Sequence, residues 1–101
     1  MIINQLDVTS GSAVQLGAAP SPCTVNVRLC NRTNSKINIS IAVVPSGTVS
    51  PGNAHWTIYA WPLDGPGMWE DTGIPLIAGD QIFVQAAASG ISASLFAMLG
   101  A

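Results

Sequence analysis

Few residues in this chain combine the types and the spacing that catalysis requires. It has a single histidine, His55, which could act as a general base only if a serine and an aspartate lay beside it. The GxSxG turn that exposes the serine nucleophile of α/β hydrolases does not occur in the sequence. We therefore expect His55 to be a solvated or hydrogen-bonded residue at the start of a strand, and we expect no catalytic residue.

The carboxylates do not form a better active site. Glu70 and Asp71 are adjacent, and Asp64 lies six residues upstream. Consecutive side chains of a strand point to opposite faces, so Glu70 and Asp71 cannot both face one substrate. Neither a glycosidase-like pair that includes Asp64 nor a calcium loop of the DxDxDG type has support in the spacing. Turn chemistry explains Asp80 well, because Gly79 permits a positive φ and the carboxylate can accept backbone N–H groups.

The two cysteines, Cys23 and Cys30, are expected to be free thiols. If they belong to one strand, they lie on opposite faces and about 23 Å apart, at about 3.3 Å per residue. A disulfide needs Cα atoms within about 7 Å, so these two cannot pair within one chain. No CxxC motif or histidine cluster occurs, so we expect no metal and no cofactor, and free thiols fit folding in a reducing cytoplasm.

Four aromatic residues offer the one candidate for ligand binding. Trp56 and Trp69 could lie in the core, whereas Tyr59 and Trp61 are two residues apart and are expected on the strand face opposite to Trp56. A platform that stacks carbohydrate needs two exposed rings on one face, and the spacing of Tyr59 and Trp61 satisfies this condition. These two residues are therefore the candidate ligand-stacking or interface site, with packing in the core or between subunits as the alternative.

The elements that must position these residues are strands, because apolar and polar residues alternate with a period of two. The clearest runs are residues 23–30 and 37–44, which a polar segment connects, and they predict a β-hairpin. Further strands are expected over residues 12–16, 55–61, 68–72, 74–77, 81–87 and 91–99. The side chains expected to point into the core are Val25, Val27, Ile39, Ile41, Ile58, Ile82, Val84 and Leu95.

Seven to eight short strands, with turn residues every 8 to 12 positions, are typical of an antiparallel β-sandwich. We expect an all-β protein of immunoglobulin-like or jelly-roll-like type, with residues 1–101 as a single domain. No amphipathic helix and no internal repeat are found in the sequence.

The composition excludes several classes of protein and favours association. Apolar residues make up 49% of the chain and charged residues 8%, with a formal net charge of -2. This is too apolar for a disordered protein, and it lacks the basic surface that nucleic acid or an anionic membrane would require. The N-terminal residues do not form a secretory signal, and residues 86–101 are shorter than the roughly 20 apolar residues of a spanning helix. A surface so poor in charge is expected to be covered by copies of the chain or by a partner.

The order of several segments carries a resemblance to a known family. These segments are Trp56-Thr57-Ile58-Tyr59, Pro62-Leu63, Gly67, Trp69-Glu70-Asp71-Thr72-Gly73, Leu76, Ala78-Gly79-Asp80-Gln81-Ile82-Phe83-Val84 and the strand over residues 91–99. In this order they resemble small β-domain structural proteins encoded by tailed bacteriophages. The resemblance covers about half of the chain.

The resemblance implies a virion component and not an enzyme. It suggests a capsid decoration or cement protein, assembled in the host cytoplasm, that acts as a homotrimer on the major capsid protein. The C-terminal strand and residues 45–53 are expected to supply the contacts. The alternatives are a small tail, neck, baseplate or fibre adaptor and, from a different class, a carbohydrate-binding module that uses Tyr59 and Trp61.

Overall fold

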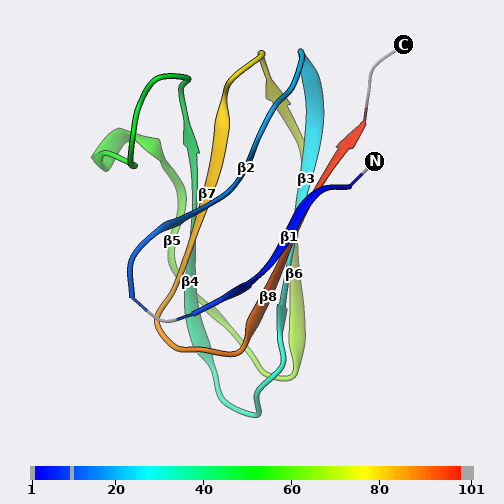
Figure 1. Ribbon diagram of the computed structural model, residues 1–101. Helices are drawn as coiled ribbons and strands as arrows, with labels where there is room; N and C mark the ends of the chain where they lie inside the picture. Colours follow the sequence, from blue (N-terminus) through cyan, green and yellow to red (C-terminus); the bar gives the residue numbers. More distant parts are fainter. Residues whose placement is uncertain (1, 10, 99–101) are drawn as a thin grey trace.

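The computed structural model describes residues 2–9 and 11–98 and consists almost entirely of strands (Figure 1). The strands are β1 (Ile2–Val8), β2 (Val14–Ala18), β3 (Cys23–Asn31), β4 (Ile37–Val44), β5 (Trp56–Leu63), β6 (Gly67–Leu76), β7 (Gln81–Ala86) and β8 (Ile91–Met98). One turn of 3-10 helix, η1 (Asn53–His55), precedes β5. None of the described helical structure is long and apolar enough to cross a membrane.

The strands form two antiparallel four-stranded sheets that pack face to face. The first sheet has the order β1-β8-β3-β6, and the second sheet has the order β2-β7-β4-β5. Strand β1 therefore pairs with β8, β2 with β7, β3 with β6, and β4 with β5. Eight strands folded over in this way form a jelly roll. The predicted antiparallel β-sandwich is confirmed, and its topology is the jelly-roll alternative.

The predicted hairpin between residues 23–30 and 37–44 is wrong. Strand β3 lies in the first sheet between β8 and β6, whereas β4 lies in the second sheet between β7 and β5. The connecting segment carries the chain from one sheet to the other. Alternation shows which residues of a strand face the core, but it contains no information about the neighbouring strand. A polar connection between two alternating runs therefore fits a crossover between sheets as well as a hairpin.

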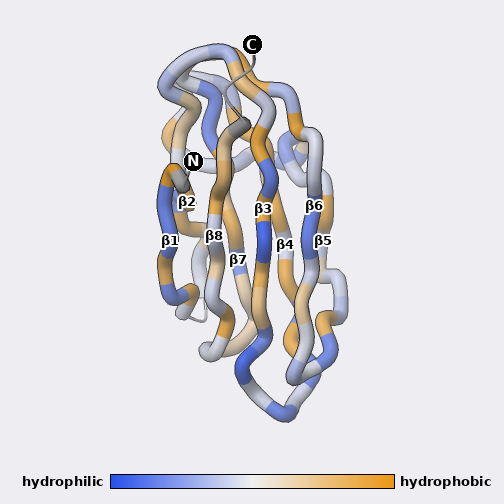
Figure 2. Tube along the Cα trace, turned by 90° about the vertical axis from the view of Figure 1, so that its right-hand side faces the viewer, coloured by the Kyte–Doolittle hydropathy of each residue, from blue (hydrophilic) through white to orange (hydrophobic). Residues whose placement is uncertain are grey.

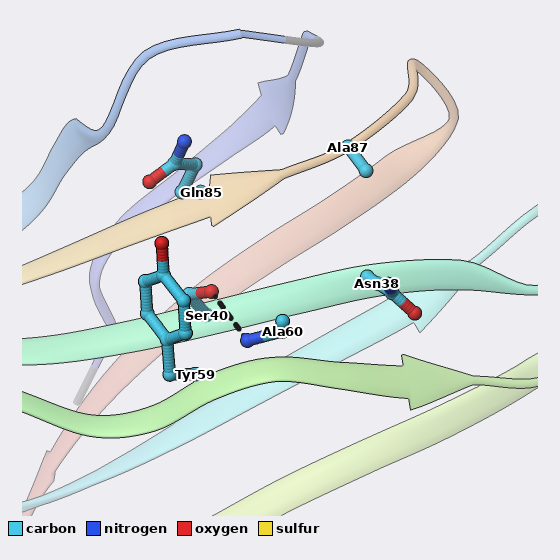
Figure 3. A pocket seen from close by; sticks show the side chains of 6 residues that line it. All are labelled: Asn38, Ser40, Tyr59, Ala60, Gln85 and Ala87. Atoms are coloured by element: carbon cyan, nitrogen blue, oxygen red, sulfur yellow. Dashed lines mark hydrogen bonds between the residues drawn. The ribbon is translucent and has the colours of Figure 1, made fainter.

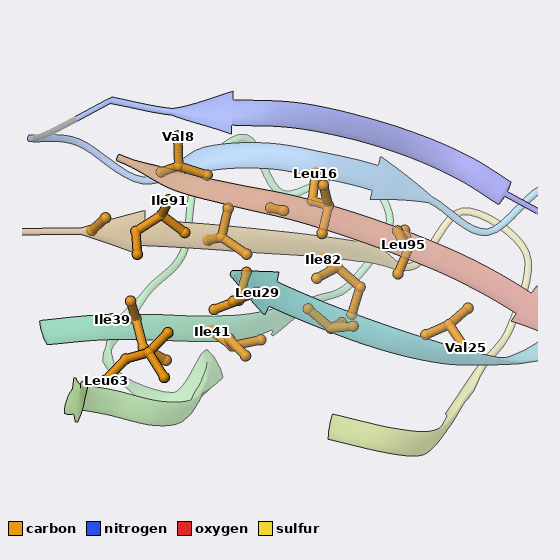
Figure 4. Packing of buried hydrophobic residues seen from close by; sticks show 14 of the residues in the cluster. Val8, Leu16, Val25, Leu29, Ile39, Ile41, Leu63, Ile82, Ile91 and Leu95 are labelled. Atoms are coloured by element: carbon orange, nitrogen blue, oxygen red, sulfur yellow. The ribbon is translucent and has the colours of Figure 1, made fainter. Parts of the chain in front are cut away.

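The main hydrophobic core lies between the two sheets (Figure 4). Of the eight residues predicted to point inward, seven are buried, and Ile58 is half-buried and packs against this core. The buried set also includes Val8, Leu16, Leu29, Ile37, Leu63, Leu76 and Ile91. Most strands thus contribute the apolar half of their alternating pattern, as expected for a sheet with one face in the core. In β4 and β7, Ala42, Val44 and Phe83 are also buried and form a second cluster.

Three strands differ from the sequence prediction. The strand expected over residues 12–16 lies two residues later, as β2. Residues 68–72 and 74–77 form one strand, β6, because Gly73 takes a φ of 74° and the strand continues past this bulge. The backbone N–H of Gly73 donates a hydrogen bond of 3.0 Å to the Asn26 side chain of β3. Strand β1 was not predicted; polar Asn4 and Gln5 interrupt its alternation, yet it pairs along β8.

Hydrophilic residues gather at one end of the sandwich, where the β3–β4 and β5–β6 loops lie (Figure 2). Asn31, at the end of β3, is fully buried there. Its side-chain amide donates to the carbonyls of Ser35 and Leu63 at 2.8 and 2.9 Å, and its oxygen accepts the N–H and O–H of Thr33. One buried side chain therefore holds the β3–β4 loop against the end of β5.

Candidate functional site

His55 is part of a backbone turn. It ends η1, and its ring Nδ1 accepts the backbone N–H of Gly52 at 2.8 Å. This bond closes the turn through which the chain enters β5. The interpretation of His55 as a hydrogen-bonded residue at a strand entry is confirmed.

The adjacent carboxylates point to different sides of β6. Glu70 lies opposite Arg28 on the outer face of the first sheet. The guanidinium of Arg28 donates two hydrogen bonds to the Glu70 carboxylate, at 2.8 and 3.1 Å. Asp71 lies opposite Val27, which is a core residue. The two carboxylates therefore do not converge on one substrate.

The turn predicted at Asp80 is present. Its carboxylate accepts the backbone N–H of Ile77 at 3.1 Å, and Gly79 adopts a φ of 90°. A Cβ on Gly79 would also come within 2.6 Å of the Ser46 hydroxyl oxygen, so a close approach adds to the conformational requirement for glycine.

The cysteines are arranged as the alternation predicted. Cys23 is buried, Cys30 is exposed, and neither forms a disulfide. Within residues 2–9 and 11–98, no three side chains of His, Cys, Asp or Glu come together in a way that could hold a metal ion.

The aromatic residues form two separate pairs, and the expected common face of Tyr59 and Trp61 is wrong. The Tyr59 ring lies edge-to-face against Trp56, with the centroids 5.5 Å apart. The Trp61 ring packs against Trp69 of β6, with the centroids 5.2 Å apart. Trp69 packs against the main core, whereas Trp56 packs against a second cluster that includes Phe83.

A bulge in β5 causes this separation. Ile58 lies opposite Ile41 and Trp61 lies opposite Ile39, so Tyr59 and Ala60 together face the single residue Ser40 of β4. Ala60 accommodates the extra residue with a φ of 51°, and its backbone N–H donates to the Ser40 hydroxyl at 2.9 Å. The bulge shifts the alternation by one residue. Tyr59 therefore faces outward, while Trp61, which is still 45% exposed, turns toward Trp69 at the edge where β5 and β6 of the two sheets meet.

Tyr59 borders a hollow on the outer face of the second sheet (Figure 3). The ring is 71% exposed, and the hollow has a volume of about 170 Å³. Its lining residues come from three adjacent strands and the residue after β7; they are Asn38, Ser40, Tyr59, Ala60, Gln85 and Ala87. A second, more open hollow of about 400 Å³ is lined by Asn53, Trp56 and Tyr59. Tyr59 thus borders both hollows.

Neither hollow has a charged side chain in its lining. The amides of Asn38, Gln85 and Asn53, the Ser40 hydroxyl and the Tyr59 phenol are the polar groups. Such a set can hydrogen-bond a neutral polar ligand while the ring covers an apolar surface of that ligand. It provides no nucleophile with an adjacent base.

The spacing of the aromatic residues indicated Tyr59 but not its polar neighbours. Asn38 and Ser40 alternate with the core residues of β4, so their outward direction was predictable. Their proximity to Gln85 depends on the pairing of β4 with β7, where Ser40 lies opposite Gln85. A single sequence does not contain that pairing.

Charge is distributed unequally between the two sheets. The strands of the second sheet contain no Asp, Glu, Lys or Arg, whereas those of the first sheet contain Asp7, Arg28, Glu70 and Asp71. Each of the three basic side chains is paired with a carboxylate: Arg28 with Glu70, Arg32 with Asp7, and Lys36 with Asp64. The second sheet therefore has an outer face of amides, hydroxyls and apolar groups.

Comparisons of this chain with protein-family models, with curated proteins and with solved structures found no match.

Proposed function

We propose that this chain is a non-enzymatic structural protein of the virion, a capsid decoration or cement protein that bridges neighbouring capsid subunits. The observation that carries the proposal is the uncharged second sheet. A surface with so little charge gives weak protection against association, which favours a chain that works in contact with a partner. The jelly-roll fold agrees with this role, since capsid domains use it, although lectins and cupins use it as well.

One end of the sandwich is suited to contact with a shell. Loops 19–22, 45–49 and 77–80, called the neutral end, lie together. Ala19 and Asp80 are joined by a backbone hydrogen bond of 2.8 Å, and Ser46 lies directly against Gly79. Val49 is 90% exposed and Ile77 is 67% exposed at this end. Asp80 is the one charged residue of these loops, and its carboxylate already accepts a backbone N–H. Apolar burial would therefore provide most of the affinity.

The proposed assembly is a homotrimer on the major capsid protein. Strand β8, which was expected to supply contacts, lies between β1 and β3, so neighbouring strands already occupy both of its edges. Among its described side chains, those that point outward and can make contacts are Ser92, Ser94 and Phe96. An interface of about 800 Å² per partner would be an ordinary stable one.

The deciding experiment locates the chain in purified particles. Mass spectrometry should detect it in the particles, and cryo-electron microscopy should show its density on the outside of the head. The isolated chain should bind shells that lack it and raise their resistance to heat. Absence from particles, or density on the tail, would overturn the proposal; tail density would favour the adaptor function.

Variants can test the neutral end directly. Val49→Lys and Ile77→Lys place cations on it and should abolish binding to shells. Met68→Lys is the matched control, because Met68 is also an exposed apolar residue, 59% exposed, but belongs to β6 of the first sheet. If Met68→Lys weakens binding as much as Val49→Lys and Ile77→Lys do, the contact surface lies elsewhere.

A further inference from the structure

We propose that the two hollows bordered by Tyr59 form a binding site for a neutral oligosaccharide. This inference goes beyond the structural role and does not depend on it, since the site lies on the outer face of the second sheet and not in the loops of the neutral end. It rests on an exposed aromatic ring, uncharged hydrogen-bonding groups around it, and a backbone held in an unusual conformation.

The ring of Tyr59 is presented as a stacking surface. It is 71% exposed, and its edge-to-face contact with Trp56 restrains its orientation. An exposed ring held in this way leaves apolar area in water, and covering it is favourable. The C–H face of a pyranose is a flat apolar surface of matching size. A sugar can therefore cover the ring while its hydroxyls remain directed outward.

Amide side chains surround the ring where those hydroxyls would lie. Asn38 of β4 has a side-chain amide with no hydrogen-bond partner among the described residues, which leaves two donors and one acceptor for a ligand. The Nε2 group of Gln85, in β7, donates to the Gly11 carbonyl at 2.8 Å. The side-chain oxygen of Gln85 can therefore accept a hydrogen bond from a ligand. Because the lining lacks charge, the ligand chemistry that fits is neutral and rich in hydroxyls, not anionic.

The backbone at the site is fixed in advance. Ala60 holds a φ of 51°, which is unusual for a residue with a Cβ, and its N–H is bonded to the buried Ser40 hydroxyl. Backbone conformations of this kind persist where the surrounding structure enforces them, and they are concentrated at functional sites. Here the conformation has a direct result, because the bulge turns Tyr59 outward over the hollow. The ligand would meet a prearranged surface.

The dimensions indicate more than one sugar unit. The hollow of about 170 Å³ is smaller than the roughly 300–1,000 Å³ of typical small-molecule pockets, which suits a single ring. The second hollow of about 400 Å³ begins at the same tyrosine and extends to Asn53. A chain of two or three sugars stacked on Tyr59 can therefore occupy both hollows.

The experiment is a nuclear magnetic resonance titration of the 15N-labelled full chain. The probes are maltotriose, cellotriose and tri-N-acetylchitotriose, with trigalacturonic acid as the anionic comparison. At least one neutral trisaccharide should shift the backbone amides of Tyr59 and Ala60 and the side-chain amides of Asn38, Gln85 and Asn53. Trigalacturonic acid should leave them unchanged at the same concentration.

Substitutions then separate stacking from general disruption. Tyr59→Ala should weaken the affinity by about tenfold or more, whereas Tyr59→Phe, which keeps the ring, should retain most of it. Met68→Ala is the control, because Met68 is also an exposed apolar residue, 59% exposed, but belongs to β6 of the first sheet and lines neither hollow. The proposal is overturned if no neutral probe shifts these amides at millimolar concentration, if Tyr59→Ala binds as tightly as the unmodified chain, or if the anionic probe binds best.

Discussion

At the scale of single residues, the buried polar side chains have specific structural tasks. Asn31 and Ser40 are the buried polar residues in the described part of the chain. Asn31 joins the β3–β4 loop to the end of β5, and Ser40 accepts the N–H that the bulge would otherwise leave without a strand partner. Both serve backbone groups that lie where regular strand pairing stops, and buried backbone groups must be paired.

Replacement of Asn31 by alanine should destabilise the protein strongly. The change removes the partners of two carbonyls and of the Thr33 N–H, and it should lower the free energy of unfolding by about 2–4 kcal/mol. Urea denaturation followed by tryptophan fluorescence measures this loss. Asn34→Ala is the control, because Asn34 is exposed in the same loop and its replacement should cost less than about 0.5 kcal/mol. Equal stability of the two variants would contradict this assignment.

Ala60 provides a second prediction at this scale. A left-handed conformation costs a residue with a Cβ about 1–2 kcal/mol, while glycine costs about 0.5–1 kcal/mol of chain entropy. Ala60→Gly should therefore keep the free energy of unfolding or raise it by up to about 1 kcal/mol. Ala87 lies at the rim of the same hollow and does not have a positive φ, so Ala87→Gly should lower the free energy of unfolding. A loss on Ala60→Gly as large as that on Ala87→Gly would rule out strain at Ala60.

At the scale of the elements, alternation predicted faces and failed to predict partners. The eight core residues were assigned correctly because a strand with one buried face has only two registers, and only one of them buries its apolar side chains. The β3–β4 hairpin and the Tyr59–Trp61 platform were wrong for one shared reason. Both depend on the neighbours of a strand. Strand β3 pairs with β6 and β8 and not with β4, and β5 has one residue more than β4 between two of their paired positions. Such relations join residues far apart in the sequence.

Strand β3 allows its two faces to be tested chemically. Cys23 is buried and Cys30 is exposed, so the native protein should expose one fast-reacting thiol per chain to a thiol reagent and the unfolded protein two. Cys30→Ser should remove the fast reaction, and Cys23→Ser should leave it unchanged. Two fast-reacting thiols in the native protein would mean that Cys23 is not buried and would contradict the assignment of the two faces of β3. Mass measurements with and without reductant should agree, because neither cysteine is expected to form a disulfide between chains.

At the scale of the whole molecule, charge is confined to the first sheet and the loops. The basic side chains are bound in three ion pairs whose members are all partly or largely exposed, and exposed pairs contribute little to stability. The second sheet and the neutral end have almost no charge to be screened. Electrostatic attraction is therefore not expected to hold the proposed assembly together.

Self-association should consequently be insensitive to salt. Light scattering of the purified chain should give a mass that is a multiple of 10.4 kDa and stays the same between about 0.05 and 1 M NaCl. An electrostatic interface would dissociate over this range as its charges are screened. A falling mass would contradict an apolar interface, and a mass of 10.4 kDa at every salt concentration would contradict self-association.

The strand order has one more consequence, which concerns how the molecule comes together. In residues 2–9 and 11–98, each strand pairing joins a member of β1–β4 to a member of β5–β8. The two halves of the chain are thus complementary pieces, and neither contains a ladder of its own. During synthesis the first four strands have no pairing partner until β5 to β8 have been made. Long-range strand pairing is slow in β proteins, and this order delays it further. Cleavage between residues 45 and 52 would leave two fragments able to fold only on each other.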